Sequence, residues 1–513
     1  MPRSPSRSRV AAPAPPAAAP AARVTAVNDR PVAPRGAHVL YWMVAARRPA
    51  WSFGLDHALA RAAELGRPLI VLEALRAGYP WASDRLHRFV LDGMAASARA
   101  FAAAGVAYHP YVEPAPGAGR GLLEALAARA ALVVTDEWPC FFVPRMVAAA
   151  AARLVVRVEQ VDGNGLLPLR ASERTFATAA AFRWHWQKVI HPHLLRAPSP
   201  APLAAAPAVV RGGEVPGAIA RRWPAASAAL LAGEAAALAR LPIDHAVRPV
   251  AERGGAPAAV AVLDDFIARR LPRYAEDRNQ PDADAASGLS PYLHFGHVGA
   301  HQILHRVWAA ADWDPSRIAT RASGKREGWW GLPPPAEAFV DEVFTWRELG
   351  HGFAFHRPDD HDRYESLPAW ARRTLDDHAA DPRPHRYDLP ALEAAATHDP
   401  LWNAAQTQLV RDGRIQNYLR MLWGKKLLEW SPSPRAALAA LVHLNNKYAV
   451  DGRDPNSYSG IFWTLGRFDR PWAPERPIFG VVRYMSSAAA QKKLALAGYL
   501  ARYGPTSRQL ALA

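Results

Sequence analysis

The spacing of hydrophobic and polar positions changes along the chain. Between residues 38 and 161, short apolar runs alternate with segments that repeat apolar residues every three or four positions. Short apolar runs predict buried strands, and the longer period predicts helices. Strands are expected at 38–44, 68–72, 107–112, 131–135 and 154–161, with helices at 53–65, 85–104 and 122–130. This alternation predicts an α/β domain with a doubly wound parallel sheet.

Helical periodicity dominates after residue 256, and this half of the chain carries most of the large aromatic residues. We therefore predict an α/β domain over residues 37–165 and an all-α domain over 256–513. Residues 166–255 are rich in Pro and Ala and contain helical patterns at 171–195 and 225–241, which indicates an interdomain connector. Residues 1–36 contain six Arg, one Asp and almost no large hydrophobic residues, which is typical of a disordered basic tail.

Composition narrows the class of protein. Lys and Arg number 62 against 46 Asp and Glu, and a net charge of +16 favours a polyanionic partner. Charge alone leaves nucleic-acid binding open, because GC-rich coding sequence also enriches Arg, Ala and Pro. The single cysteine, Cys140, excludes an intrachain disulfide and a Cys-rich zinc site, and it fits a reducing, cytoplasmic compartment. No apolar stretch approaches the roughly 20 residues that span a bilayer, so no membrane partner is expected.

Two familiar kinds of site receive little support from the sequence. The α/β segment has neither a GxGxxG nor a GxxxxGK[ST] motif, so it reveals no chemistry of its own. Four histidines, at steps of three or four, have a spacing that invites a metal hypothesis: His294, His297, His301 and His305. Only the first belongs to a motif described below, and we predict no metal site.

The first distinctive cluster joins Tyr274-Ala-Glu-Asp-Arg-Asn279 to Ala286-Ser-Gly-Leu-Ser-Pro-Tyr-Leu-His-Phe-Gly296. Hydroxyl groups and exposed backbone amides before Pro291 are suited to cradle an anion at a helix start. Taken alone, Ser290-Pro291 is more often an ordinary helix N-cap with proline in the first turn.

Further motifs follow at 399–406, 418–430, 444–456, 475–480 and 483–485. In order and spacing, this succession resembles the photolyase/cryptochrome family, and class II cyclobutane pyrimidine dimer (deoxyribodipyrimidine) photolyases in particular, over roughly residues 250–500. The run Val39-Leu-Tyr-Trp-Met43 matches the first strand of that family more loosely. The resemblance implies an α/β N-terminal domain followed by an all-α domain that binds FAD. It leaves open whether an antenna chromophore of the deazaflavin or folate type is also bound.

The resemblance also implies a cofactor site. Arg420 and Asp451 match an ion pair beside the flavin ring, and Asn445 matches a side chain that faces a ring nitrogen. A structural salt bridge and a helix cap are the alternatives for these residues. The full implied set is Tyr274, Ser287, Gly288, Leu289, Ser290, Arg347, Arg420, Asn445, Asp451 and Asp454.

Tryptophans of the 418–430 segment share one helix face, since Trp423 and Trp430 are seven residues apart. A core stripe would explain this pattern as well. The resemblance instead implies an electron-transfer chain that photoreduces FAD. Its expected order is Trp423 nearest the flavin, Trp402 in the middle and Trp430 at the surface.

The resemblance implies a substrate pocket with two further aromatic residues. Glu342 and Trp346 lie four residues apart and would share a helix face. Trp346 and Trp463 are expected to pack on flipped pyrimidines, with Tyr418 and Met421 nearby. Glu342 is expected to be catalytic, by hydrogen bonding to the pyrimidine.

The implied activity is light-driven repair of cyclobutane pyrimidine dimers in DNA, by electron transfer from photoexcited reduced FAD in a monomeric enzyme. The alternatives are a cryptochrome-like photoreceptor without repair, repair of (6-4) photoproducts, and a flavin-free DNA-binding structural protein. Residues 322–331 read as an insertion and depart from the class II pattern.

Overall fold

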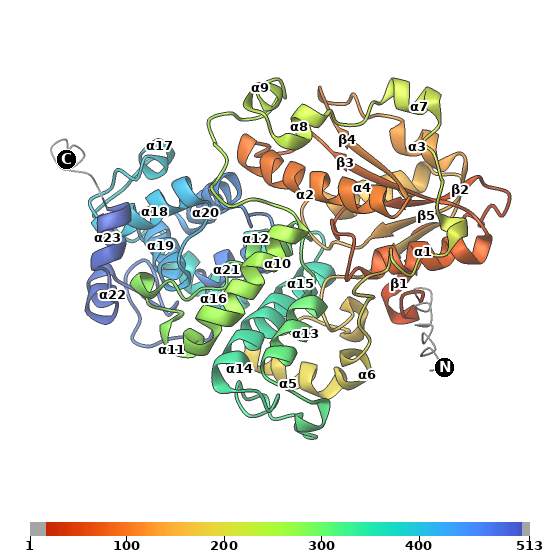
Figure 1. Ribbon diagram of the computed structural model, residues 1–513. Helices are drawn as coiled ribbons and strands as arrows, with labels where there is room; N and C mark the ends of the chain where they lie inside the picture. Colours follow the sequence, from red (N-terminus) through yellow and green to blue (C-terminus); the bar gives the residue numbers. More distant parts are fainter. Residues whose placement is uncertain (1–16, 505–513) are drawn as a thin grey trace, which may run out of the picture.

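The computed structural model describes residues 17–504, which form a sheet body and a helical body (Figure 1). The sheet has the strand order β1-β6-β5-β2-β3-β4, in which only β1 is antiparallel to its neighbour. Its strands are β1 (Val24–Ala26), β2 (His38–Trp42), β3 (Leu69–Leu75), β4 (Ala107–Val112), β5 (Ala130–Asp136) and β6 (Val158–Val161). The predicted doubly wound α/β domain is confirmed.

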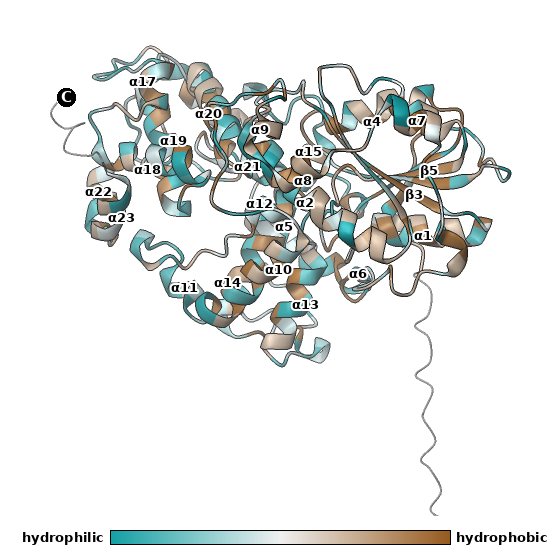
Figure 2. Cartoon of the chain, turned by 45° about the horizontal axis from the view of Figure 1, so that its top comes forward, coloured by the Kyte–Doolittle hydropathy of each residue, from teal (hydrophilic) through white to brown (hydrophobic). Residues whose placement is uncertain are grey.

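Helices cover both faces of this sheet, which explains why its central strands β2, β3 and β5 are buried at almost every position. Val39 and Tyr41 of β2 enter the core on one face, whereas Leu40 and Trp42 enter the core on the other. In Figure 2 the hydrophobic strands lie between their covering helices. These helices are α1 (Phe53–Leu65), α2 (Asp84–Ala103), α3 (Leu122–Ala127) and α4 (Val143–Arg153).

The predicted basic tail is too long at its C-terminal end. Strand β1 and the short turn Ala21–Arg23 before it are ordered parts of the sheet body. The buried guanidinium of Arg23 donates to the backbone oxygens of Asp162 (3.1 Å) and Leu166 (2.5 Å). A strand of three residues is too short to give a periodic signal, so the pattern could not reveal it. Residues 1–16 of the predicted tail lie outside the described residues.

The helical body contains two apolar cores, one around α18 to α20 and one around α10 and α13 to α15. The helices of this body are α10 (Ala256–Asp265), α11 (Tyr274–Asp277), α12 (Ser290–His294), α13 (Ala300–Ala310), α14 (Pro334–Val340), α15 (Arg347–His356), α16 (Ala369–Asp377), α17 (Leu389–Glu393), α18 (Pro400–Asp412), α19 (Asn417–Trp430), α20 (Pro434–Tyr448), α21 (Pro455–Trp463), α22 (Ser487–Lys493) and α23 (Ala497–Tyr503). Among residues 17–504, no helix is long and apolar enough to cross a membrane.

The predicted connector is divided between the two bodies. Helices α5 (Ala179–Val189) and α6 (His191–Leu194) contribute to a core of the helical body, where the Trp186 ring packs against Trp329. Helices α7 (Gly217–Arg222), α8 (Ala228–Ala232) and α9 (Ala235–Leu238) lie beside the sheet body (Figure 1). The helix expected over 225–241 is broken at Gly233, whose φ of 67° ends α8.

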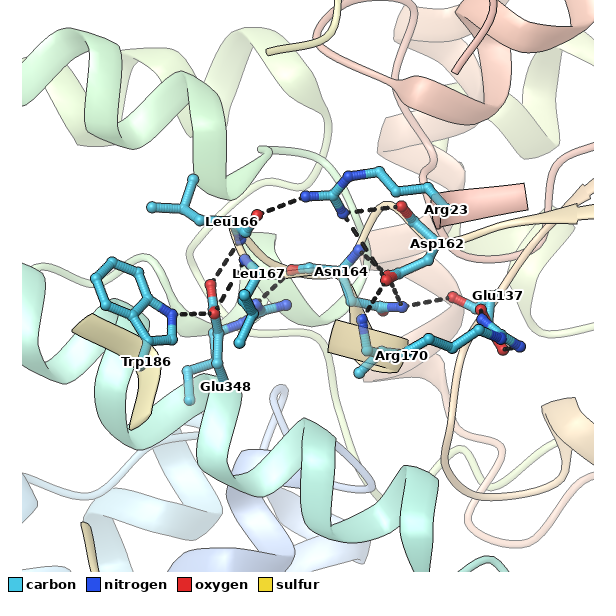
Figure 3. Close-up of polar contacts among 11 residues, drawn as sticks. Arg23, Glu137, Asp162, Asn164, Leu166, Leu167, Arg170, Trp186 and Glu348 are labelled. Carbon is cyan, nitrogen blue, oxygen red and sulfur yellow. Dashed lines mark hydrogen bonds and ion pairs between the residues drawn. The ribbon is translucent and has the colours of Figure 1, made fainter. Parts of the chain in front are cut away.

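A buried carboxylate fastens the two bodies together (Figure 3). Glu348, near the start of α15, accepts hydrogen bonds from the backbone N–H groups of Leu166 (2.6 Å) and Leu167 (3.3 Å) and from Trp186 Nε1 (2.8 Å). Burial raises the pKa of Glu348 to about 7, although these donors oppose the shift. The loop after β6 is therefore tied to the first turn of α15.

We predict that Glu348→Ala lowers the free energy of unfolding by about 3 kcal/mol, because three buried donors lose their acceptor. Its raised pKa means that the folded state binds the proton of Glu348 more tightly than the unfolded chain. The contribution of Glu348 is therefore largest below its ordinary pKa and declines as pH rises through about 7. Thermal unfolding should show a larger deficit for the variant at about pH 5 than at about pH 8.

The matched control is Glu64→Ala, which removes an exposed carboxylate whose partner, Arg61, lies on the same helix. This change should alter stability by less than about 0.5 kcal/mol at either pH. Equal unfolding temperatures for Glu348→Ala and Glu64→Ala would contradict the role given to the buried carboxylate.

Candidate functional site

A cavity of about 720 Å³ opens in the helical body. Its volume lies within the usual range for cofactor and ligand pockets, roughly 300 to 1,000 Å³. Its walls come from α5, α11, α12, α19 and α21 and from the residues just before α15. Most of the predicted site residues line it, namely Tyr274, Ser287, Leu289, Ser290, Glu342, Trp346, Arg347, Arg420, Met421, Asp451, Asp454 and Trp463.

The Ser287–Ser290 turn forms part of the wall where α12 begins. Gly288 lies behind this wall with φ of +72°, a conformation that favours glycine over residues with a side chain. This backbone turn brings Ser287 and Ser290 to the cavity together. The resemblance identified these residues, whereas their local spacing alone was equally consistent with an N-cap.

Charged side chains meet on another part of the wall. Arg420 Nη2 and Asp451 Oδ1 are 3.6 Å apart, so the structure brings the expected pair together. His294 Nδ1 lies 3.3 Å from Asp454 Oδ2. Burial alone would raise the pKa of Asp454, but the hydrogen bond with His294 and nearby positive charge lower that pKa to about 2. Asp454 is therefore an anion at neutral pH.

Two buried polar atoms at the cavity lack hydrogen-bond partners among residues 17–504. They are Asp451 Oδ1 and Arg347 Nε, one acceptor and one donor. Unsatisfied buried polar atoms are uncommon and often await a ligand, an ion or water. Together with the hydroxyls of Ser287 and Ser290, they fit a ligand that has a polar ring edge, hydroxyls and phosphates. The residues present therefore fit the FAD that the resemblance implies.

Glu342 and Trp346 lie on a π-helical turn, Asp341–Trp346, and not on the expected α-helix. π-helical turns inside longer helices are frequent at functional sites, and both side chains still face the cavity. Arg278 donates a hydrogen bond to the carboxylate of Glu342. Burial raises the pKa of Glu342, and the charge of Arg278 opposes that shift.

The expected aromatic residues of the substrate pocket do not all reach the cavity. Trp463 lines it from the end of α21, and Met421 lines it from α19. Tyr418 is two residues from Arg420, hence on another side of α19, and Lys493 Nζ lies 4.9 Å from its ring centre. The structure thus separates Tyr418 from the rest of the predicted pocket.

Asn445 is buried one side chain behind the cavity wall. Its amide nitrogen donates to Ser457 Oγ (2.8 Å), and Ser457 lines the cavity. Sequence analysis missed Ser457, together with Asn417 and Arg326. Asn417 could have been found from its position four residues before Met421 on a helix. Arg326 comes from the segment interpreted as an insertion, and nothing in its local pattern indicated that it would reach the cavity.

The three tryptophans lie in one apolar core. Trp402 is in the middle, because its Nε1 donates to the backbone oxygen of Trp423 (3.1 Å) and its ring centre is 5.3 Å from that of Trp430. The expectation that Trp430 lies at the surface is wrong, since only 3% of it is exposed. Tyr387 and His398 pack against the Trp430 ring, at 5.2 and 5.4 Å between ring centres.

The spaced histidines each pack in a different environment. His301 and His305 contact the rings of Phe53 (5.2 Å) and Trp51 (4.9 Å), respectively. His297 Nδ1 accepts from the backbone N–H of Gly255 (2.8 Å). Within the described part of the chain, no group of three or more His, Cys, Asp or Glu side chains could hold a metal ion.

Comparison with known proteins decides the family. No family model matches the chain. The chain is 33% identical over 487 residues to a deoxyribodipyrimidine photo-lyase of Methanothermobacter thermautotrophicus, covering 94% of this chain and 98% of that protein. The chain belongs to the deoxyribodipyrimidine photo-lyase family. A photo-lyase of Oryza sativa subsp. japonica is 35% identical over 482 residues, covering 91% of this chain and 87% of the relative.

Solved structures of the photolyase/cryptochrome group share the fold. A bacterial class III photolyase from Agrobacterium tumefaciens has a TM-score of 0.65 at 18% identity, covering 91% of this chain and 86% of that one. A cryptochrome of Synechocystis has a TM-score of 0.64 at 17% identity, covering 91% and 88%. The predicted family, enzyme class and two-part fold are thereby confirmed.

Proposed function

We propose that the protein is a class II photolyase that uses FAD and light to repair cyclobutane pyrimidine dimers in DNA. The observation that carries this proposal is a single cavity with two kinds of wall. One wall offers hydroxyls and charged groups suited to a cofactor, and the other offers Glu342, Trp346 and Trp463. Relatives that match nearly the whole chain are deoxyribodipyrimidine photo-lyases, which supports the same activity.

The cofactor would be held by the Ser287–Ser290 turn, Tyr274, Arg347, Arg420 and Asp454. Reduced FAD, when bound and excited by light, supplies the electron that opens the cyclobutane ring and receives it back. Arg347 and Arg420 contribute positive charge to the cavity, whereas Asp451 and Asp454 contribute acceptors. Asn445 would act through Ser457, to which it donates a hydrogen bond.

A dimer within a duplex must leave the base stack to reach this cavity. Flipping it out costs less than flipping normal bases, because a damaged base pairs and stacks poorly. Trp346 and Trp463 would stack on the flipped pyrimidines. Burial raises the pKa of Glu342 and so makes its carboxyl easier to protonate; once protonated, it would donate a hydrogen bond to a pyrimidine carbonyl. Arg278 would keep that carboxyl in position.

DNA binding would rest on the excess of cationic side chains. Arg326, Arg470 and Arg483 line the cavity, where they could contact phosphates beside the flipped lesion. The chain as a whole has a net charge of +16, and phosphate contacts dominate the affinity of such proteins for DNA.

The tryptophan chain would deliver electrons to the cavity. Trp423 lies three residues after Arg420 of the cavity wall, on the same side of α19. Trp402 contacts Trp423, and Trp430 contacts Trp402. Tyr387 and His398 cover Trp430, so the last step to solvent would pass these residues. The retained Glu342 and the two cavity indoles favour repair over light sensing alone.

We predict that Trp463→Ala weakens binding of dimer-containing DNA by about 1 to 3 kcal/mol, the worth of one base stacked on an aromatic ring. Binding of undamaged DNA should change little, because a base that stays in the duplex does not reach Trp463. Trp184→Ala is the control, since this indole is 45% exposed and does not line the cavity. Equal losses on both DNAs would remove Trp463 from the lesion pocket.

We predict that Trp423→Phe nearly abolishes photoreduction of bound FAD, because phenyl rings are much harder to oxidise than indoles. The packing cost should be roughly 1 to 3 kcal/mol, so the protein still folds. After chemical reduction with dithionite, the variant should split dimers in light at close to the unmodified protein's rate.

The control is Trp308→Phe, a buried indole in the other helical core that contacts Trp313. This control should photoreduce normally. A Trp423→Phe protein that retains flavin and photoreduces as fast as this control would show that the indoles serve only as core.

A further inference from the structure

Lys425 of α19 is a buried cation that the proposed repair reaction does not use. Its side chain has no exposed area. Its Nζ donates to the backbone oxygen of Thr464 (2.6 Å) and lies 5.2 Å from the ring centre of Trp463. Removing an ammonium group from water is costly unless partners compensate for it. The partners of Lys425 are the indole that lines the cavity and the residue that follows it.

The backbone around Trp463 is held against α19 at two neighbouring positions. A Cβ at Gly424 would come within 2.5 Å of Thr464 Cγ2, so only glycine permits this close approach. Lys425 then fixes the carbonyl of Thr464. Met421 lies four residues before Lys425 on the same face of α19, and it lines the cavity together with Trp463. Lys425 thus lies behind the cavity wall, against the indole.

We propose that Lys425 is a positioning residue that holds the Trp463 ring for lesion binding through a cation–π contact, and that deprotonation of Lys425 weakens this binding. The inference rests on the proposed function, since it needs Trp463 to contact the lesion. A cation over an indole contributes about 0.5 to 2 kcal/mol, with the larger values where the cation is desolvated, as buried Lys425 is.

The groups that face Lys425 set the pH range of this contact. Burial lowers the pKa of Lys425 to about 7, Asp469 opposes the shift, and Arg483 adds to it. Arg483 also lies over the Trp463 ring, 5.7 Å from its centre, and its charge is permanent. Of the two cations near the Trp463 ring, only Lys425 therefore changes its charge near neutral pH.

The direction of the effect follows from the lowered pKa. Below about pH 7 Lys425 is charged and the cation–π contact exists. As pH rises through that value the amine becomes neutral, keeps its hydrogen bond to Thr464 and loses its electrostatic attraction to the ring. The preference for dimer-containing over undamaged DNA should therefore fall by about threefold to tenfold between about pH 6 and about pH 8.

The test measures dissociation constants of the FAD-loaded, full-length protein for matched dimer-containing and undamaged duplexes at both pH values and constant salt. Lys425→Arg should keep the high dimer preference at both pH values. Lys425→Met should have the low preference at both, and loss of a buried charge should not prevent folding. Glu342 also lines the cavity and is unchanged in both variants, so any pH dependence that it adds appears equally in both, and the difference from the unmodified protein isolates Lys425.

The matched control is Lys426→Met. Lys426 is also buried, but it is paired with Glu429 (2.8 Å) and lies over Trp430. Its variant should keep the pH dependence of the unmodified protein. The inference is overturned if Lys425→Met or Lys425→Arg retains the unmodified pH profile. A protein in which Trp463→Ala also leaves dimer preference unchanged would instead refute the proposed lesion pocket.

Discussion

The burial of one carboxylate determines how the cavity is built. Glu348 takes three hydrogen bonds from Leu166, Leu167 and Trp186, and so fixes the first turn of α15 to the loop after β6. The turn just before α15 carries Glu342 and Trp346. The loop after β6 therefore supports the wall that carries Glu342 and Trp346, although this loop does not itself line the cavity.

The cavity next to this contact has one wall suited to a cofactor and another suited to a DNA lesion. Charged and hydroxyl groups gather on α12, α19 and the loop before α21, where they fit a flavin. Indoles and a carboxyl with a raised pKa gather on the π-helical turn and at the end of α21, where they would fit two flipped neighbouring pyrimidines. Electron transfer between a cofactor and a lesion requires the two to lie close together, and both walls line the same cavity.

Local pattern predicted the regular parts of this structure well. Helix α1 has the bounds that its periodic pattern predicted, and in the structure Ser52 caps its start and Gly66 ends it in the left-handed region. Strand β1 was not predicted, because a strand of three residues is too short to show a periodic pattern of hydrophobic positions. The candidate site residues were predicted from the resemblance of motifs. Tertiary packing decides three features that the sequence did not reveal: the π-helical turn, the burial of Trp430, and the position of Asn445 behind Ser457. The role of Lys425 could not be predicted, because the sequence does not distinguish a buried lysine from an exposed one.

The most direct test of the central claim is illumination of the purified, reduced protein with DNA that contains either a cyclobutane thymine dimer or a (6-4) photoproduct. Each lesion is quantified in light and in darkness. The account predicts loss of the cyclobutane dimer in light only, with no loss of the (6-4) photoproduct. Unchanged dimer levels in light, equal loss in darkness, or repair of the (6-4) photoproduct alone would contradict it.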